Sequence, residues 1–276
     1  HNARLGCMIT ASHNPVSDSG LKVFDARGFK STPHFEDHVS AVADALASEE
    51  REIDEIESEE LSQASEPYIA SMGASASHPL WLTERFGHFQ TLVGAQGFDA
   101  SHLANPFVLD CSKGAAHTWL AAWLSERGIH TVEVSAEAEA LNLNCGAGDF
   151  SPTQTWTFEE AASSSHRLLQ NLRQAPAGTI VGAALDGDGD RCLVIQATEQ
   201  GFMVVDGDAL GDAILSAAAH QSNRPWHLAA SIESDLSLLS TAHRLPAEVA
   251  VIETAVGDRW LSKALEHTLL ASKAAP

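Results

Sequence analysis

Short apolar runs alternate with helix-like patterns from about residue 107 to residue 252, and this alternation constrains the fold more than any other feature of the sequence. Predicted strands lie at 107–109, 131–134, 180–185, 192–195, 203–205, 228–232 and 249–252. Predicted helices lie between them at 118–127, 158–173 and 209–220. Strands that alternate with helices predict an α/β fold, whose parallel or mixed sheets are covered by helices on both faces.

The first 60 residues continue this pattern on a smaller scale. Apolar residues at 5–9 and 21–24 flank a polar, turn-rich segment, which predicts two strands joined by a loop. Apolar positions three to four residues apart predict a helix over 33–46. The acidic segment 48–60 is interpreted as a solvated helix face or a linker.

Composition excludes several classes of protein. Hydrophobic residues make up 44% of the 276 residues and charged residues 19%, which is typical of a globular protein that buries a core. The net charge of −21 would repel nucleic-acid phosphates, so no nucleic-acid partner is expected. No apolar run is long enough for a membrane span, so no membrane partner is expected. Four widely spaced cysteines predict reduced, mostly buried thiols in a cytoplasmic protein.

An acidic loop, residues 186–191, follows the apolar run 180–185 directly. Its carboxylates, Asp186, Asp188 and Asp190, are separated by single glycines, which leave room for a tight bend. In such a bend the three side chains can converge on one cation, and without a cation they would repel one another. Hard oxygen ligands suit Mg²⁺, so the loop predicts a magnesium site.

Other interpretations of this loop fit less well. A calcium-binding EF-hand would need glycine at its sixth position and glutamate at its twelfth, where this chain has Arg191 and Ala197. A phosphatase loop with an aspartate nucleophile usually has threonine or valine at the place of Asp190. A plain acidic surface turn is the remaining alternative.

A serine loop, residues 10–15, follows the first apolar run and reads Thr-Ala-Ser-His-Asn-Pro. The hydroxyl of Ser12 is a weak nucleophile unless its neighbours activate it, and His13 and Lys22 are the nearest candidates along the chain. Alone, the segment could be an ordinary capping turn. A phosphorylated serine beside three aspartates would require a divalent metal, and the acidic loop supplies a site for one.

These two loops, with Gly-Leu-Lys at 20–22, resemble the phosphoserine loop and metal loop of the α-D-phosphohexomutase superfamily. Residues 110–115 resemble the segment that opens the second domain of that family. Segments 141–149, 206–208 and 256–259 resemble bacterial-type phosphoglucosamine mutases in particular. The resemblance extends over nearly the whole chain and implies a fold of consecutive α/β domains with an active cleft between them.

The resemblance also implies a metal site and a phosphate carrier. Ser12 would carry the phosphoryl group as phosphoserine. Asp186, Asp188 and Asp190 would bind Mg²⁺, with an oxygen on Ser12 as a further ligand.

The remaining roles fall on basic residues. Arg191 would neutralise the phosphate on Ser12, Lys22 would be the general acid/base at the sugar hydroxyl, and His13 would assist or orient. The implied reaction interconverts hexose 6-phosphate and 1-phosphate through a hexose bisphosphate. Glucosamine phosphate is the favoured substrate. Mannose, glucose and N-acetylglucosamine phosphates are alternatives within the superfamily.

The chain departs from the family pattern at several places. Ser19 precedes Gly20 where asparagine is usual, and Ala255 replaces a common lysine. The substrate-reading loop G-E-x-S-G-H and the phosphate loop R-x-S-G-T-E-P are missing from the sequence, as is the segment that precedes the serine loop. We therefore expect a fragment, and two alternatives of other classes stay open: a non-catalytic sugar-phosphate binding protein and an aspartate-nucleophile phosphatase.

The expected domains follow from this alignment of motifs. Residues 1–72 would be the C-terminal part of a first domain that carries the serine loop, and 73–97 a junction. Residues 98–205 would form a second domain with the acidic loop, and 206–276 an incomplete third domain. The sequence does not indicate an oligomeric state.

Overall fold

The computed structural model describes residues 5–48, 77–95, 99–222 and 224–274. The chain divides into two compact units, one made of His1–Gly6 and Val23–Leu92 and the other of Cys7–Lys22 and Val93–Pro276. The acidic segment 48–60 lies outside the described residues, except for its first residue. The serine loop and the acidic loop both belong to the second unit.

The strands of the described residues fall into three sheets. β1 and β2 pair with each other, β9 pairs in parallel with β10, and the other six strands form a mixed sheet in the order β4-β3-β6-β7-β8-β5. The pairs β3/β4 and β3/β6 are parallel, whereas β6/β7, β7/β8 and β8/β5 are antiparallel. The strands are β1 Leu5–Thr10, β2 Gly20–Asp25, β3 Leu103–Asp110, β4 Thr131–Glu133, β5 Thr155–Thr157, β6 Ile180–Leu185, β7 Cys192–Ala197, β8 Gly201–Val205, β9 Trp226–Ser231 and β10 Val249–Thr254.

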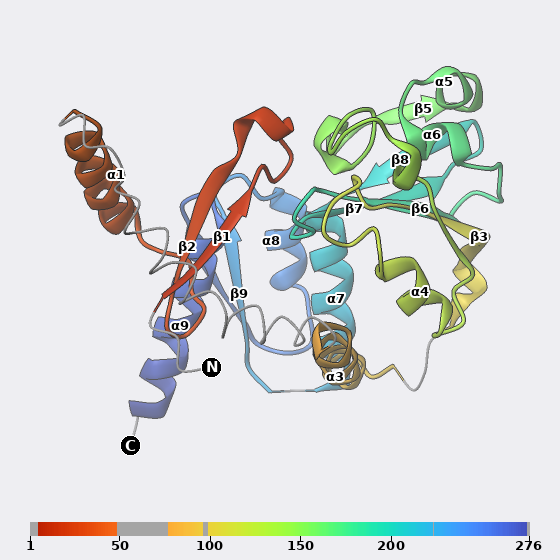
Figure 1. Ribbon diagram of the computed structural model, residues 1–276. Coiled ribbons are helices and arrows are strands. Elements are labelled where there is room, and N and C mark those ends of the chain that lie inside the picture. Colours follow the sequence, from red (N-terminus) through yellow and green to blue (C-terminus); the bar gives the residue numbers. More distant parts are fainter. Residues whose placement is uncertain (1–4, 49–76, 96–98, 223, 275–276) are drawn as a thin grey trace. The chain divides into compact units, whose positions relative to one another are not determined.

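Helices cover both faces of the six-stranded sheet (Figure 1). The α-helices are α1 Pro33–Ser48, α3 Ser77–Leu92, α4 Leu120–Ser125, α5 Phe158–Ser163, α6 Arg167–Asn171, α7 Gly207–Gln221, α8 Leu236–Ala242 and α9 Asp258–Ala274. Short 3₁₀ helices lie at Val16–Asp18, Ala100–His102, Ser135–Glu137 and Ala147–Asp149. The predicted α/β class with a mixed, two-sided sheet is confirmed.

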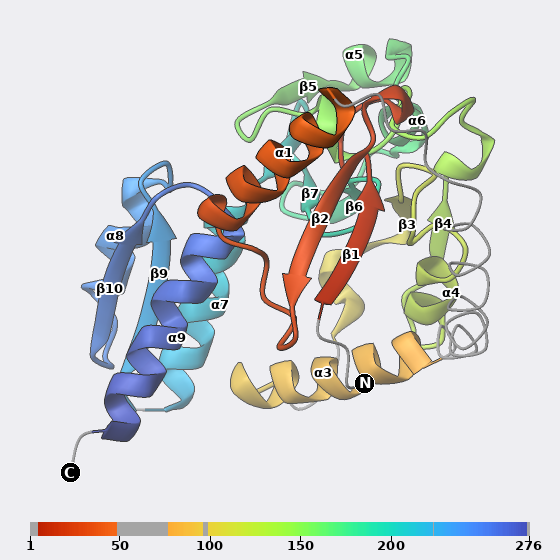
Figure 2. The same cartoon turned by 60° about the vertical axis from the view of Figure 1, so that its left-hand side comes forward.

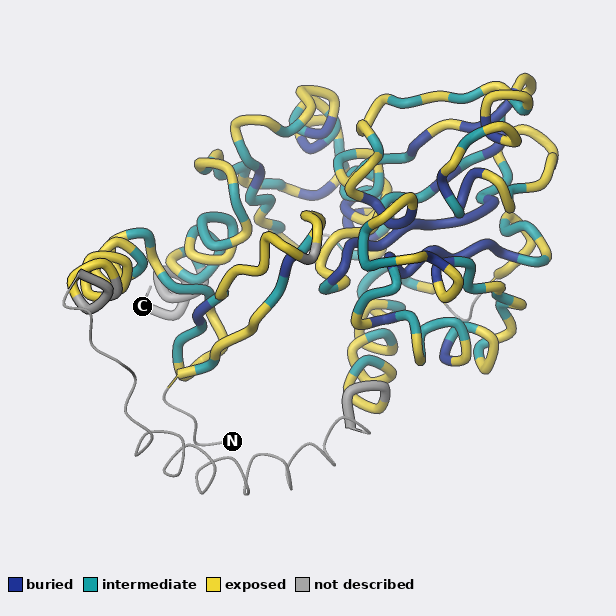
Figure 3. Tube along the Cα trace, turned by 45° about the horizontal axis from the view of Figure 1, so that its top comes forward, coloured by how far each residue is buried: buried dark blue, intermediate teal, exposed yellow. Residues whose placement is uncertain are grey.

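The core of the six-stranded sheet consists of two hydrophobic clusters on opposite faces. On one face Ala161 of α5 and Leu168 and Leu169 of α6 pack in one cluster with Val108 and Val181. On the other face α4 packs over a second cluster that includes Leu109. Central strands that are buried on both faces require continuous apolar runs, which is why β6 stood out in the sequence. Figure 3 shows the same buried strands in dark blue.

Local chemistry explains where several helices begin. The side chain of Asp206 accepts a hydrogen bond of 2.9 Å from the backbone N–H of Ala209 and caps α7. Thr157 and Glu160 form a reciprocal capping box at the start of α5. Farther along the chain, α9 lies beside β9 and β10 (Figure 2).

The prediction of one helix over 158–173 is wrong. The structure has two short helices there, α5 and α6, with an extended break between Ser163 and Arg167. Buried His166 causes the break, because its Nδ1 accepts from the N–H of Leu168 and its Nε2 lies 3.0 Å from the carbonyl oxygen of Gly146. A tertiary contact therefore overrides the helical pattern.

The four cysteines are free, as expected. Cys111 and Cys145 are buried, whereas Cys7 and Cys192 are exposed, so the expectation of mostly buried thiols holds for only two. Among the described helices, none combines the length and the apolar character that crossing a bilayer requires.

Candidate active site

The serine loop leaves β1 with a reversal of the backbone at Ser12, whose φ of 52° lies in the left-handed region. The hydroxyl of Thr10 accepts a 2.8 Å hydrogen bond from the backbone N–H of Ser12. The N–H of Asn14 donates to the carbonyl oxygen of Ala11 at 2.9 Å. These bonds hold a short, tight turn that presents the Ser12 side chain and its carbonyl oxygen.

The acidic loop lies directly against this turn. The backbone N–H of Gly187 donates a 3.0 Å hydrogen bond to the carbonyl oxygen of Ser12. A Cβ at Gly187 would lie 2.5 Å from that oxygen, so only glycine permits this approach. The carbonyl oxygen of Gly187 accepts from the N–H of Ala115 at 2.9 Å, so the peptide groups on both sides of Gly187 are held.

The three predicted metal ligands converge. Asp186, Asp188 and Asp190 each offer a carboxylate oxygen, and these oxygens lie within 4.8 Å of one another. Among the described residues this is the one cluster of three or more potential ligands. The hydroxyl of Ser12 donates a 3.1 Å hydrogen bond to Asp186 Oδ2, so the predicted phosphate carrier lies at the edge of the same cluster.

The carboxylates differ in their surroundings. Asp186 is 1% exposed, and burial raises its pKa above the ordinary value of 3.8, with the charges of Asp190 and Asp188 acting in the same direction. Its Oδ1 accepts backbone hydrogen bonds from Gly189 and Arg191, and the bond from Arg191 lowers the pKa without cancelling the effect of burial. A carboxylate in this position is more stable as an anion when a cation lies beside it.

Asp188 carries an oxygen without a partner. Its Oδ2 accepts hydrogen bonds from Thr10 at 3.0 Å and from Lys22 at 2.5 Å, but its Oδ1 is buried and makes no hydrogen bond. Unpaired buried acceptors are costly, and they are uncommon in folded proteins. Together with the two neighbouring carboxylates, this oxygen fits the donor set of a hard divalent cation.

Lys22 is an ion-pair partner of the cluster. Its Nζ lies 2.5 Å from Asp188 Oδ2 and 2.9 Å from Asp190 Oδ2. Burial is the largest effect on the pKa of Lys22 and lowers it, but the hydrogen bonds and charges of the two aspartates outweigh burial and raise the pKa above 10.5. For Asp188, burial raises the pKa, and the bonds from Lys22 and Thr10 bring it below 3.8. Lys22 is therefore an ammonium ion that supplies positive charge to the acidic loop.

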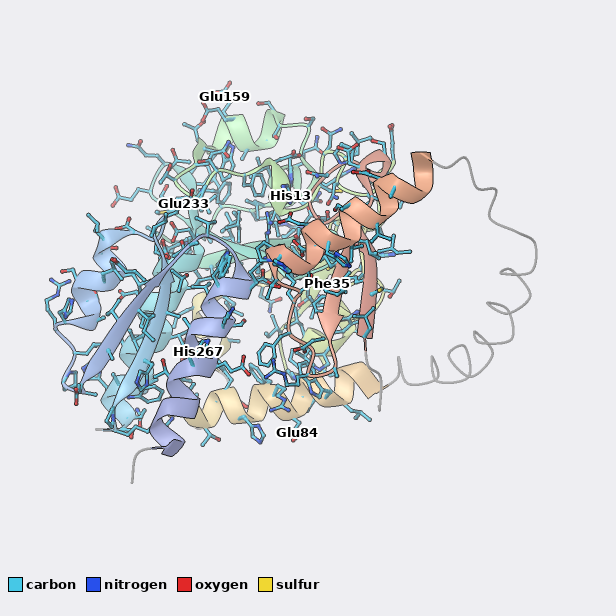
Figure 4. All side chains as sticks on the ribbon, turned by 90° about the vertical axis from the view of Figure 1, so that its left-hand side faces the viewer. His13, Phe35, Glu84, Glu159, Glu233 and His267 are labelled. Carbon is cyan, nitrogen blue, oxygen red and sulfur yellow. The ribbon has the colours of Figure 1, made fainter. Side chains whose placement is uncertain are left out.

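Arg191 and His13 contact each other. An Arg191 guanidinium nitrogen lies 3.1 Å from His13 Nδ1, and because guanidinium groups only donate, Nδ1 is the acceptor. Arg191 is also 3.8 Å from Asp186 Oδ2 through its Nε. His13 itself lies in the loop between β1 and β2 (Figure 4). Its backbone passes so close to Gly148 that a Cβ there would lie 3.1 Å from the His13 carbonyl oxygen.

Sequence reasoning missed two residues that organise this site. Thr10 bonds both the Ser12 N–H and Asp188, and Asn142 bonds the serine loop from a segment 130 residues away. The segment around Asn142 resembles the family, but the resemblance does not indicate a role for this residue. Asparagines at 142 and 144 just before two glycines were the available sequence signal, because both residue types tolerate the left-handed conformation that Asn142 adopts.

Comparisons with known proteins agree with this geometry. Residues 1–50 match the family described as phosphoglucomutase/phosphomannomutase, alpha/beta/alpha domain I. The phosphoglucosamine mutase of Nocardia farcinica is 33% identical over 96% of this chain and 53% of its own length. Those of Rhodococcus erythropolis and Jannaschia sp. are 30% and 31% identical over 95% of this chain and 50% of their own lengths. Over nearly its whole length, the chain is similar to members of the α-D-phosphohexomutase superfamily.

The chain spans about half the length of the curated relatives it matches. The serine loop lies within residues 1–50, which match the family model. The acidic loop lies outside that segment, in the part of the chain that aligns with the curated relatives. The structure brings Ser12, Lys22 and the three aspartates together, with His13 and Arg191 in contact beside them.

Proposed function

We propose that this chain carries the phosphoryl-transfer centre of a phosphohexomutase, with glucosamine phosphate as the favoured hexose phosphate. The observation that supports the proposal most is the 3.1 Å hydrogen bond between the Ser12 hydroxyl and Asp186, made across 174 residues of sequence. It joins a serine to a cluster of three carboxylates. The relatives named phosphoglucosamine mutase supply the choice of sugar.

Asp186, Asp188 and Asp190 would hold Mg²⁺, with a Ser12 oxygen as a further ligand. The unpartnered Asp188 Oδ1 supports this assignment, because it is a buried acceptor on one of the three clustered carboxylates. When bound, a divalent cation stabilises charge on the oxygens of a transferring phosphoryl group.

The chain's own groups would then position the phosphate and move one proton. Arg191 lies 3.8 Å from Asp186, close enough to place positive charge beside a Ser12 phosphate. We propose that Lys22 exchanges a proton with the sugar hydroxyl. As a base it must first lose its proton, and the aspartates that now raise its pKa oppose this. If those carboxylates bound a cation instead of Lys22, the pKa of Lys22 would fall, and this would favour its proposed role as a base.

The cycle balances in two half-reactions. In the first, the P–O bond to Ser12 breaks and a P–O bond to the free sugar hydroxyl forms, giving a hexose bisphosphate. The base takes the proton of that hydroxyl and passes it to the departing Ser12 oxygen. In the second, the Ser12 hydroxyl attacks the other phosphate of the bisphosphate and gives its proton to the base, which passes it to the released sugar oxygen.

We propose a cytoplasmic location for this activity. The four free cysteines, two of them exposed, suit a reducing compartment. Fractionation of cells that produce the native protein would test the proposal, and recovery with the extracellular or membrane fraction would contradict it.

Intact-mass analysis tests the function. The chain is incubated with Mg²⁺ and glucosamine 1,6-bisphosphate, and we expect the gain of one phosphoryl group, mapped by peptide digestion to Ser12. The Ser12→Ala variant should gain none, and Asp188→Asn should gain it at least about tenfold more slowly.

The other classes of function predict different outcomes. An aspartate-nucleophile phosphatase would hydrolyse the bisphosphate equally well after Ser12→Ala and would lose turnover with Asp186→Asn. A non-catalytic sugar-phosphate binding protein would bind the bisphosphate and gain no phosphoryl group. Either pattern would overturn the proposal.

A further inference from the structure

The side chain of Asn142 reaches the serine loop from a separate segment of the chain. Its Nδ2 donates two hydrogen bonds, to the carbonyl oxygen of Ser12 at 2.8 Å and to that of Asn14 at 2.7 Å. These two carbonyls lie on either side of His13. One amide group therefore bridges the turn that carries the Ser12 hydroxyl.

The Ser12 carbonyl oxygen is shared by two loops. It accepts from Asn142 Nδ2 and from the backbone N–H of Gly187 at 3.0 Å. Both bonds hold the peptide that follows Ser12, whose own φ of 52° is a conformation that serine seldom adopts. A strained turn persists only when its surroundings fix it, and Asn142 supplies two of the bonds that do so.

The amide of Asn142 is itself oriented by a buried group. The hydroxyl of Ser112, which is fully buried, donates to Asn142 Oδ1. The two serine-loop carbonyl oxygens only accept, so the amide nitrogen must face them, and the amide oxygen is then left to accept from Ser112. The N–H of Ser112 donates to buried Asp110 Oδ1 at 2.8 Å, and Asp110 Oδ2 accepts from Gly146 at 2.9 Å.

We propose that Asn142 is a positioning residue that fixes the direction of the Ser12 side chain relative to the acidic loop. It acts through the backbone of the serine loop: among the described residues, its side chain bonds Ser112 and two serine-loop carbonyls, and neither the carboxylates nor the Ser12 hydroxyl. Its catalytic consequence rests on the proposed function of Ser12, whereas its effect on the conformation of the loop does not.

Hydrogen–deuterium exchange on the whole chain tests the positioning role without any activity. We compare Asn142→Ala with Asn144→Ala, a matched control two residues away. Asn144 is also left-handed, with φ of 52° against 59° at Asn142, so both substitutions carry the same backbone cost. The Asn144 side chain accepts from Ser165 rather than reaching the serine loop.

Asn142→Ala should speed exchange in residues 10–15 and at Gly187 by about tenfold and leave exchange in β6 near the wild-type rate. In Asn144→Ala, exchange in residues 10–15 and at Gly187 should stay near the wild-type rate. A second variant separates the hydrogen bonds from backbone strain. Asn142→Asp keeps the shape, the acceptor for Ser112 and tolerance of the left-handed region, but it faces two carbonyls without a donor. We therefore expect Asn142→Asp to speed exchange in the serine loop and at Gly187 as Asn142→Ala does.

Two results would overturn the inference. In one, Asn142→Asp exchanges like the wild type. In the other, Asn142→Ala speeds exchange throughout 98–205, which would indicate a general structural role. Phosphoryl uptake by Ser12 is measured in parallel and should slow at least about tenfold in both Asn142 variants. If even the wild-type chain takes up no phosphoryl group, the proposed function fails and the exchange result still decides this inference.

Discussion

At the residue scale, the acidic loop contains two carboxyl groups whose pKa values move in opposite directions. Burial raises the pKa of Asp186. For Asp188, the contacts with Lys22 and Thr10 outweigh burial and lower the pKa. The difference arises because Lys22 reaches Asp188 and Asp190, whereas Asp186 has only neutral donors and a distant guanidinium. Without a bound cation, the ammonium of Lys22 is the main charge that balances the cluster.

Lys22 and a divalent cation would compete for the same carboxylate oxygens, and this makes the first prediction. In EDTA, Lys22→Gln should lower the free energy of unfolding by about 1–2 kcal/mol, since a partly buried pair loses one partner. In calorimetric titrations the same variant should bind Mg²⁺ several-fold more tightly, because no ammonium must be displaced. The charge-matched control is Lys263→Gln on α9, where the ammonium lies over the Trp260 ring. Weaker Mg²⁺ binding by Lys22→Gln would contradict the competition.

A second prediction concerns pH. The folded-state pKa of Asp186 is raised above 3.8, so its favourable contribution is complete below that value and is lost as pH rises through the folded-state pKa. In EDTA, Asp186→Asn should therefore have a higher melting temperature than the wild type. The difference in melting temperature should be larger at about pH 7.5 than at about pH 4.5. With Mg²⁺ present, Asp186→Asn should no longer melt at a higher temperature than the wild type, since it lacks one of the carboxylates proposed to bind the ion. A gain that shrinks as pH rises would refute the assigned shift.

At the element scale, apolar runs identified the strands that matter most. The continuous run of β6 was visible because it is buried on both faces, and the acidic loop begins where it ends. The three-residue strand β5 was missed because its single apolar residue, Trp156, lies between two threonines and shows neither an apolar run nor a period. The helix α3 was missed because 77–92 combines glycine, proline and aromatic residues without a clear apolar stripe.

The contact between the two loops depends on a glycine, and this gives a third prediction. Gly187→Ala would bring a Cβ to 2.5 Å from the Ser12 carbonyl oxygen, so the serine loop must move away. We expect a loss of about 1–3 kcal/mol in unfolding free energy, together with weaker Mg²⁺ binding. Urea unfolding and calorimetry measure both quantities. Gly211→Ala in α7, where the nearest atom is 4.0 Å away, serves as the control and should be neutral or slightly stabilising. An equally mild effect at Gly187 would show that the approach of the loops is not tight.

At the scale of the whole molecule, sequence reasoning identified the ligands but not what holds them. Aspartates alternating with glycine after a strand predicted a cation loop from local chemistry alone. Only the family resemblance placed Ser12 beside these aspartates, because Ser12 and Asp186 are 174 residues apart in the sequence. The contacts of Thr10 and Asn142 are tertiary, and no local pattern specifies which carbonyl an amide will meet.

The expected domain boundaries stay a proposal: 1–72, a junction at 73–97, 98–205 and 206–276. Limited proteolysis tests them, since exposed connections are cut before packed sheets. Early cleavage should yield a stable fragment that begins within 73–97. Initial cuts inside 98–205 would contradict the proposed second domain.

The central claim is that the serine side chain and the three carboxylates surround one cation. Replacing Ser12 by cysteine supplies a thiolate, which gives an ultraviolet charge-transfer band when it binds Cd²⁺. Titration of Ser12→Cys with Cd²⁺ should produce this band at one equivalent, above any background from the native cysteines in the wild type. The band should disappear in Ser12→Cys/Asp188→Asn. If Ser12→Cys gives no band beyond the wild type, or one that persists without Asp188, the two loops do not share a cation site.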